Sequence, residues 1–326
     1  PKRVFIHDGD VCFVLDAATG KELARWKPPT HRDGKPSKWG YIAFDNGLLY
    51  GSVANEEYLI KCWSDRWDTS NQFTESTLLF ALDADTGRPV WTFEPDHSIR
   101  HNAIAMGGGR VYLIDRPVAT EDELNPPPKR SPGKAEPTEP VHPTGRLVAL
   151  DQSTGKPVWT ANDDIFGTLL MYAAENDLLW MGYQAAHQAS RASERANRMA
   201  VFNSANGEKQ WDIVAEYDDR PVLNGQTIYA PPGAWDLLTG SKLPFELNRS
   251  YGCGTIAGCR EMLIFRSATL GYIDLSRSQE TQNYGGIRPG CWIAAIPAGG
   301  IVTMPDAASW CTCSYLNQGT LALKPV

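Results

Sequence analysis

Short runs of apolar residues recur along the chain, and a polar turn follows each of them. The runs cover residues 11–15, 78–82, 147–150 and 199–202. Their length and their bounding turn residues are typical of buried β-strands. Two more strands are expected upstream of a run, as at residues 102–106 and 110–114, with three glycines between them. The pattern therefore predicts units of four antiparallel strands.

Each apolar run leads into the same short phrase. Residues 83–91 read Asp-Ala-Asp-Thr-Gly-Arg-Pro-Val-Trp, and residues 151–159 read Asp-Gln-Ser-Thr-Gly-Lys-Pro-Val-Trp. Weaker copies begin at Asp16, Asn203 and Asp236. The Asp or Asn side chain can accept a hydrogen bond from the backbone two residues on, while glycine takes a positive φ. We therefore expect a tight turn in every copy.

A recurring turn of this kind marks a stack of equivalent units, as in a β-propeller. Two further units lack the phrase, at residues 254–273 and 291–323. We predict one all-β domain over residues 1–326, a propeller of seven four-stranded antiparallel blades. Eight is the alternative, because the first strand of the opening unit is missing, as in an excerpt of a longer chain. The repeated Trp91, Trp159 and Trp211 are expected to pack between blades.

Three inserts interrupt this rhythm, at residues 55–77, 116–144 and 184–198. Long inserts on a rigid scaffold tend to carry function or disorder. The second contains three consecutive prolines and is predicted to be a surface loop. The third lacks proline and glycine and is predicted to form one short helix. The first and third would roof one mouth of the propeller.

Composition narrows the function classes. The formal net charge of −7 argues against a nucleic-acid groove. No apolar run is long enough to span a bilayer. The chain has seven cysteines, of which Cys12 lies in an apolar run and is predicted to be an inert core thiol. Disulfides, free thiols and a metal site all remain open for Cys253, Cys259, Cys291, Cys311 and Cys313, and disulfides would imply an oxidising compartment.

The copies of Leu-Asp-x-x-Thr-Gly-Lys-x-x-Trp resemble the repeat of pyrroloquinoline-quinone (PQQ) enzymes and of BamB-like outer-membrane assembly propellers. The C-terminal stretches at residues 251–255, 285–292 and 311–315 look like a segment of large secreted bacterial propeller proteins. The resemblance implies a periplasmic or secreted propeller. Quinone-dependent alcohol dehydrogenases carry two adjacent cysteines over the cofactor, and this chain has no such pair. Their Ca²⁺ ligands find no match either, so neither PQQ nor Ca²⁺ is expected.

In a propeller, the loops that lead into the innermost strands rim one mouth. Polar and aromatic residues gather at several of these places, and we predict a ligand site at Arg100, His101, Asn102, Arg249, Tyr251, Arg288, Trp292 and Tyr315. Guanidinium groups suit carboxylates, and aromatic rings suit sugar faces. In the structural alternative, the arginines pair with acidic residues of neighbouring blades and the histidine bonds a backbone carbonyl. Second-rank candidates are Trp39, Trp63, Trp67, Arg191 and Arg195.

Three functions are compatible with this sequence. The first is a scaffold that binds a protein or glycan in its central funnel. The second is a lyase on an acidic glycan, in which arginines neutralise the uronate and His101 or Tyr251 takes the proton. The third is a PQQ-dependent dehydrogenase. Fold alone does not choose among them.

Overall fold

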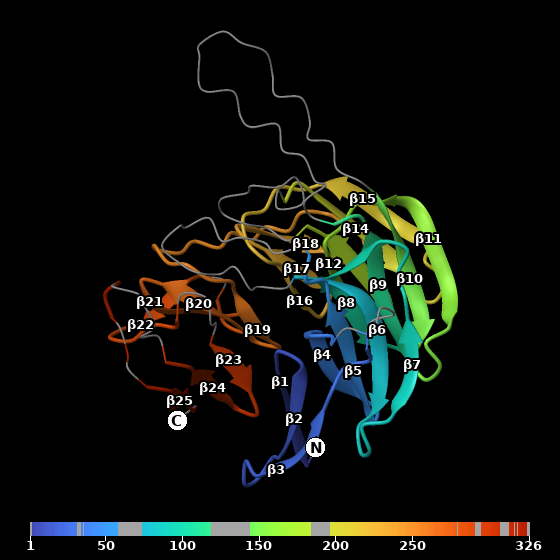
Figure 1. Cartoon of the computed structure of the whole chain (residues 1–326). Coiled ribbons are helices and arrows are strands. Elements are labelled where there is room, and N and C mark those ends of the chain that lie inside the picture. Colours follow the sequence, from blue (N-terminus) through green and yellow to red (C-terminus); the bar gives the residue numbers. More distant parts are fainter. Residues whose placement is uncertain are drawn as a thin grey trace, which may run out of the picture. The chain divides into compact units, whose positions relative to one another are not determined.

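The computed structural model describes most of the chain (Figure 1). The described residues are 2–30, 34, 36–57, 74–118, 144–183, 196–278, 280–290, 295–306, 313–315, 317 and 319–324. Throughout these ranges the backbone forms strands, turns and coil without any helix, so the all-β prediction is confirmed. Residues 58–73, 119–143 and 184–195 are outside the description, and with them lie most of the three inserts and the expected short helix.

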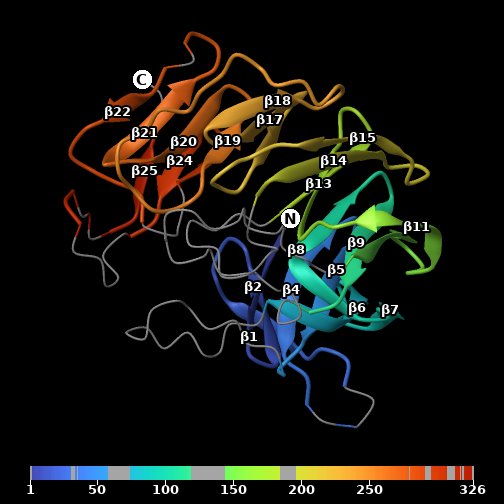
Figure 2. The same ribbon diagram turned by 90° about the horizontal axis from the view of Figure 1, so that it is seen from above.

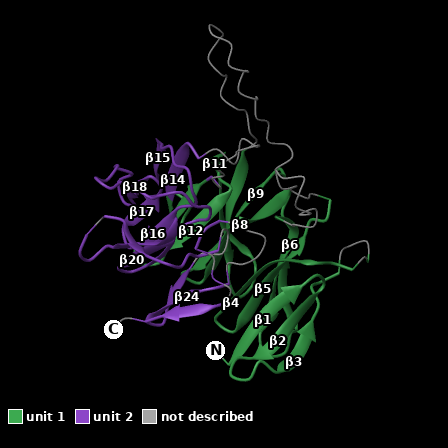
Figure 3. Ribbon diagram, turned by 90° about the vertical axis from the view of Figure 1, so that its left-hand side faces the viewer, with its two compact units in different colours: residues 1–182, 190–193, 202–208 green, residues 183–189, 194–201, 209–326 purple. Residues whose placement is uncertain are grey.

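The chain divides into two compact units (Figure 3). Unit 1 comprises residues 1–182, 190–193 and 202–208, and unit 2 comprises residues 183–189, 194–201 and 209–326. Each unit is built from antiparallel sheets whose strands follow chain order. This order is what consecutive propeller blades require. The numbers of blades and of domains stay predictions.

Unit 1 begins with a three-stranded sheet, β1 (Arg3–Asp8), β2 (Val11–Asp16) and β3 (Glu22–Trp26). Two four-stranded groups follow, and Figure 2 shows several of their strands side by side. The first group is β4 (Trp39–Asp45), β5 (Leu48–Ala54), β6 (Glu75–Asp83) and β7 (Pro89–Phe93). The second is β8 (Ser98–Gly107), β9 (Arg110–Arg116), β10 (Gly145–Asp151) and β11 (Pro157–Ile165). A short pairing of β6 with β8, at Glu75↔Arg100 and Ser76↔Ile99, joins the groups.

The next sheet is the place where the division into units falls. Its order is β12 (Leu169–Ala173), β13 (Leu178–Gly182), β14 (Arg198–Asn203) and β15 (Lys209–Val214). Unit 2 continues with three sheets, listed in chain order as β16 (Val222–Asn224), β17 (Thr227–Ala230) and β18 (Gly233–Asp236), then β19 (Ala257–Cys259), β20 (Met262–Ser267), β21 (Thr269–Asp274) and β22 (Gln282–Tyr284), and last β23 (Ile296–Ala298), β24 (Ile301–Met304) and β25 (Leu321–Leu323).

The recurring phrase forms the predicted turn in every copy. In the turn at residues 151–155, the Asp151 carboxylate accepts hydrogen bonds from the Ser153 N–H at 3.1 Å and the Thr154 N–H at 2.9 Å. Gly155 then adopts φ +67°. The other copies repeat the first of these bonds, and their glycines have φ between +70° and +76°. The hydroxyl of Thr86 holds the pKa of Asp83 below its ordinary value, which shows that the charged carboxylate fits the turn.

The repeated tryptophans, which were predicted to pack between blades, each pack against the glycine of the following turn. The Trp91 indole donates a hydrogen bond to the Gln152 carbonyl at 3.0 Å, and its ring covers Gly155. Trp159 makes the same contacts with Ser204 and Gly207, and Trp211 makes them with Leu237 and Gly240. In the opening sheet Trp26 lies over Gly87. Consecutive strand groups are therefore locked together by one repeated contact.

The strands of unit 1 enclose well-packed apolar clusters. One cluster contains Tyr50, Leu79, Ile99, Leu113 and Val148, which come from β5, β6, β8, β9 and β10. All five side chains are almost completely buried. Burial of such side chains contributes roughly 1.5–3 kcal/mol each. This cluster gives the inner ends of the same strands a rigid base.

The tryptophan contact makes a specific stability prediction. A Cβ on Gly155 would lie 2.5 Å from Cδ2 of the Trp91 ring, whereas a Cβ on Gly20 would meet no atom within 4 Å. Both glycines have nearly the same positive φ, +67° and +71°. We expect Gly20→Ala to cost about 1 kcal/mol through backbone strain alone. Gly155→Ala should cost about 3 kcal/mol, because overpacking adds to the strain.

Urea denaturation of the two variants and the parent measures this difference. Gly20→Ala is the matched control, since it changes the same turn without touching a tryptophan. Equal losses for the two variants would show that the tryptophan contact contributes nothing beyond backbone strain.

Candidate functional site

The predicted residues of unit 1 lie where β6 meets β8. Glu75 is 1% exposed, and its carboxylate accepts hydrogen bonds from the Ser98 hydroxyl at 2.8 Å and the Arg100 Nε at 3.2 Å. The Arg100 side chain is itself 11% exposed. A buried carboxylate needs such partners, because an uncompensated charge in the interior is costly. Arg100 therefore neutralises a buried acid of its own unit.

His101 belongs to a series of hydrogen bonds that crosses strands β4, β5, β6 and β8. The Tyr41 N–H donates to the Ser52 hydroxyl at 2.7 Å, which lies 2.7 Å from the Ser76 hydroxyl. The Ser76 hydroxyl lies 2.8 Å from Nε2 of His101. A Cβ on Gly40 would come within 2.8 Å of polar atoms of Ser52, Ser76 and His101. Glycine at this position therefore leaves space for the three hydrogen-bonded side chains.

The surroundings of His101 make it a weak base. Burial lowers its pKa from 6.5 to about 4, and the nearby His7 acts in the same direction. A hydrogen bond with the backbone of Glu75 opposes this shift without cancelling it. The ring is therefore neutral near pH 7. Its bonds to Ser76 and to the backbone match the structural alternative more closely than a catalytic role. Asn102 follows on the same strand and is partly buried.

A second buried carboxylate of unit 1, that of Asp115, also has an arginine partner. Asp115 on β9 is fully buried, and its carboxylate accepts hydrogen bonds from the backbone N–H groups of Asp96 and His97. Arg146 on β10 binds the same carboxylate at 2.8 Å. Sequence analysis missed Glu75, Asp115 and the two serines. An acidic residue inside an otherwise apolar strand, as at Asp115, is the signal that points to such a pair.

The predicted residues of unit 2 have different surroundings. Arg288 is completely buried and donates to the Ser314 carbonyl at 3.0 Å and the Pro289 carbonyl at 3.2 Å. Tyr251 and Tyr315 are 54% and 49% exposed. Trp292 lies outside the described residues, as do four of the second-rank candidates, Trp63, Trp67, Arg191 and Arg195. The remaining one, Trp39, is buried in a cluster with Leu49 and Phe80.

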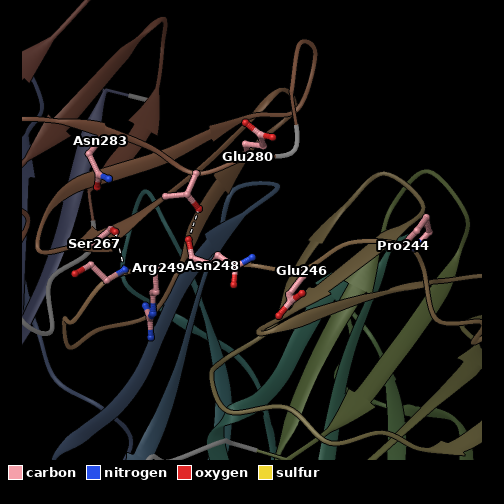
Figure 4. A pocket seen from close by; sticks show the side chains of 9 residues that line it. Pro244, Glu246, Asn248, Arg249, Ser267, Glu280 and Asn283 are labelled. Atoms are coloured by element: carbon pink, nitrogen blue, oxygen red, sulfur yellow. Dashed lines mark hydrogen bonds between the residues drawn. The ribbon is translucent and has the colours of Figure 1, made fainter.

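Arg249 lines a cavity of about 690 Å³ in unit 2 (Figure 4). Its guanidinium donates to the Gly254 carbonyl at 3.2 Å and pairs with Asp219 at 3.3 Å. Burial raises the pKa of Asp219, although the positive charge of Arg249 acts in the opposite direction. The remaining lining residues are Pro244, Glu246, Asn248, Ser250, Ser267, Glu280, Thr281 and Asn283. Apart from Pro244, every one of them carries a polar side chain.

The cavity forms where the repeat loses its fourth strand. After the turn at Gly240, only the bridge Trp235↔Lys242 remains of the strand that would complete the sheet of β16, β17 and β18. The chain then runs without regular strand through residues 243–256. The Thr281 hydroxyl donates to the Asn248 carbonyl, and the Ser250 N–H donates to the Ser267 hydroxyl at 2.9 Å. These bonds tie the irregular segment to its neighbours and shape the cavity wall.

Of the predicted site residues, Arg249 alone is among those that line this cavity. Sequence analysis missed Glu246, Glu280 and Asn283, which belong to no repeated phrase. The predicted funnel that would join residues of both units stays a prediction.

The described cysteines are free thiols. Cys12 is buried in β2, and burial raises its pKa to about 11, as expected for an inert core thiol. Cys253 and Cys259 are exposed, and Cys313 is partly exposed. None of these three forms a disulfide in the structure, so the disulfide expectation is not supported for them. Cys62, Cys291 and Cys311 lie outside the described residues. Within the described ranges, no three His, Cys, Asp or Glu side chains are grouped to hold a metal ion.

The pKa of His101 leads to a pH prediction. Because the folded pKa of about 4 lies below the ordinary value of 6.5, the unfolded chain takes up the proton first as pH falls. The free energy of unfolding should therefore decrease from about pH 6.5 to about pH 4. His101→Gln should flatten this decrease, whereas His97→Gln, which changes an exposed histidine, should leave it intact. Urea midpoints at half-unit pH steps measure the slopes, and an unchanged slope in His101→Gln would refute the assignment.

Comparisons with known proteins address the fold. A family profile described as outer membrane protein assembly factor BamB matches residues 7–165. BamB from Moraxella catarrhalis is similar in structure with a TM-score of 0.56 at 13% identity, and the match covers 98% of this chain and 78% of that chain. A search of curated proteins gave no significant match.

Two other solved structures have TM-scores below 0.5, and no argument rests on them. The computationally designed Ika8 protein has a TM-score of 0.46 at 11% identity, with 93% of this chain and 90% of that chain covered. Europium-containing methanol dehydrogenase has a TM-score of 0.49 at 12% identity, with 94% and 60% covered.

The recurring turn, the tryptophan contact and the match to BamB point to the same architecture. At 13% identity, the structural likeness establishes the fold and leaves the activity open. None of the described residues forms a helix with the length and apolar character needed to cross a membrane. Residues 7–165 match the BamB family profile, and the chain has the fold of a PQQ-like β-propeller.

Proposed function

We propose that this propeller is a non-catalytic binding scaffold whose ligand occupies the cavity of unit 2. The cavity itself is the observation that carries the proposal. Its volume of about 690 Å³ lies within the usual range for ligand sites. Eight of its nine lining residues offer hydrogen-bonding side chains, which would orient a polar ligand.

The chemistry of the predicted catalytic residues favours binding over cleavage. A lyase needs a base that takes a proton near neutral pH and cations that neutralise the uronate. His101 has a pKa of about 4 and is hydrogen-bonded to Ser76. Arg100 is paired with Glu75, and Arg249 with Asp219. These charges already stabilise the protein's own carboxylates.

The quinone hypothesis receives no support from the described donor groups. The Ca²⁺ that accompanies PQQ is bound by oxygen ligands, largely carboxylates. No group of three acidic, His or Cys side chains in the described ranges is suited to a metal ion.

The family supports a scaffold role outside the cytoplasm. Its description is that of an outer membrane assembly factor, which implies work on protein partners near an outer membrane. We accordingly propose a periplasmic or secreted location, with a protein or a glycan as the ligand class. A rigid propeller that presents a polar cavity suits either of them.

Filling the cavity tests this proposal. Asn248 is exposed and lines the cavity, and its hydrogen bond with Thr281 uses the backbone carbonyl, so Asn248→Trp should fold normally. We expect the parent protein to bind members of a peptide array or a glycan array. Asn248→Trp should weaken that binding by about tenfold or more, because the indole would occupy the ligand's place.

Val214→Trp is the control, since Val214 is 85% exposed and does not line the cavity. It should bind like the parent. Equal binding by the parent and Asn248→Trp would refute the site. Release of unsaturated products from uronate polymers by the purified parent would replace the scaffold with an enzyme.

A further inference from the structure

The cavity of unit 2 combines several flat polar side chains of different hydrogen-bonding character. Glu246 and Glu280 bring carboxylate acceptors, and Asn248 and Asn283 each bring an acceptor oxygen and a donor nitrogen. Arg249 brings further N–H groups beyond the two that bond Gly254 and Asp219. Figure 4 shows these side chains around one space. A ligand that both donates and accepts at neighbouring atoms matches this lining.

The charge of the lining selects against an acidic ligand. The lining contains two carboxylates, Glu246 and Glu280, and one guanidinium, Arg249, which is already paired with Asp219. Among the described residues, no lysine or arginine forms an ion pair with Glu246 or Glu280. A uronate would meet these carboxylates without compensation, and like charges in one site repel each other. Hydroxyl groups meet no such penalty, because each can donate to a carboxylate and accept from an amide.

Tyr251 is an exposed aromatic residue that adjoins the cavity lining in the sequence. It follows the lining residue Ser250, is not itself among the lining residues, and is 54% exposed. The guanidinium carbon of Arg266 lies 5.6 Å from its ring centroid, so a cation covers one face. The Ala268 N–H donates to the Tyr251 carbonyl at 2.8 Å and fixes the backbone at this point. The exposed part of the ring is available to an apolar sugar face.

We propose that the cavity of unit 2 binds a neutral carbohydrate. The carboxylates and amides of Glu246, Asn248, Glu280 and Asn283 bind adjacent hydroxyls, and Tyr251 stacks on a sugar ring. This inference rests on the proposed scaffold function and narrows its ligand class. Each of these four side chains has two polar atoms at its end and can therefore bind two neighbouring hydroxyls of a sugar. A charged ligand would instead need a surplus of the opposite charge in the lining.

Calorimetric titration with cellohexaose, mannohexaose and xylohexaose tests the proposal, with hexagalacturonate as the acidic comparison. At least one neutral hexasaccharide should bind, and hexagalacturonate should bind at least about tenfold more weakly. The affinity for the neutral sugar should change less than about twofold between 50 mM and 500 mM NaCl, because a neutral sugar forms no ion pair that salt could screen.

Matched variants assign the residues. Asn283→Ala and Tyr251→Ala should each weaken binding by about tenfold. The control is Gln282→Ala, the exposed neighbour of Asn283 on β22. It should bind like the parent. Tyr251→Phe should also bind like the parent, because stacking uses the ring and not the hydroxyl.

Three results would overturn the proposal. They are silence across all three neutral sugars, tighter binding of hexagalacturonate, and equal losses in the cavity variants and their control. If peptides bind instead and Asn248→Trp abolishes that binding, the scaffold function stands and the carbohydrate assignment falls.

Discussion

The contact of a tryptophan with the glycine of the next turn is the constraint on which the rest of the structure depends. Trp91 illustrates it: the indole donates to Gln152 and the ring lies against Gly155, which is separated from it by a full strand group. The contact needs a glycine twice over, for its positive φ and for the absence of a Cβ. Four such contacts link the consecutive strand groups from β1–β3 to β16–β18, as in other repeat proteins whose units bury their faces against each other.

Because the strand groups pack closely against one another, buried polar side chains of their strands need hydrogen-bonding or charged partners nearby. Glu75 with Arg100, and Asp115 with Arg146, satisfy buried carboxylates within unit 1. His101 completes a chain of hydroxyls under Gly40. Of these residues, the sequence singled out Arg100 and His101 as site candidates. Their hydrogen bonds match the structural alternative, in which polar side chains of the strands stabilise one another.

The cavity of unit 2 lies where the repeat lacks a complete fourth strand. The segment after Gly240 forms no full fourth strand, so residues 243–256 are free to bend around a cavity. Irregular backbone held by a few hydrogen bonds on a rigid sheet is a common way to position ligand-binding groups. The residues that line the cavity belong to no copy of the repeated phrase, so the repeat does not constrain which side chains they carry.

The sequence by itself determined the strands and the turns, because both follow from local chemistry: apolar runs, an Asp or Asn cap and a glycine at fixed spacing. It also indicated that the repeated tryptophans pack between units, while the tertiary structure decided which glycine each ring covers. The sequence also identified Arg249 as a residue of interest. Only the tertiary structure decided that Arg288 is buried against backbone carbonyls and that Glu246, Glu280 and Asn283 face one cavity with Arg249. The cavity residues are up to 37 positions apart, from Glu246 to Asn283. Only folding brings residues so far apart together, so no local sequence pattern predicts that they share a cavity.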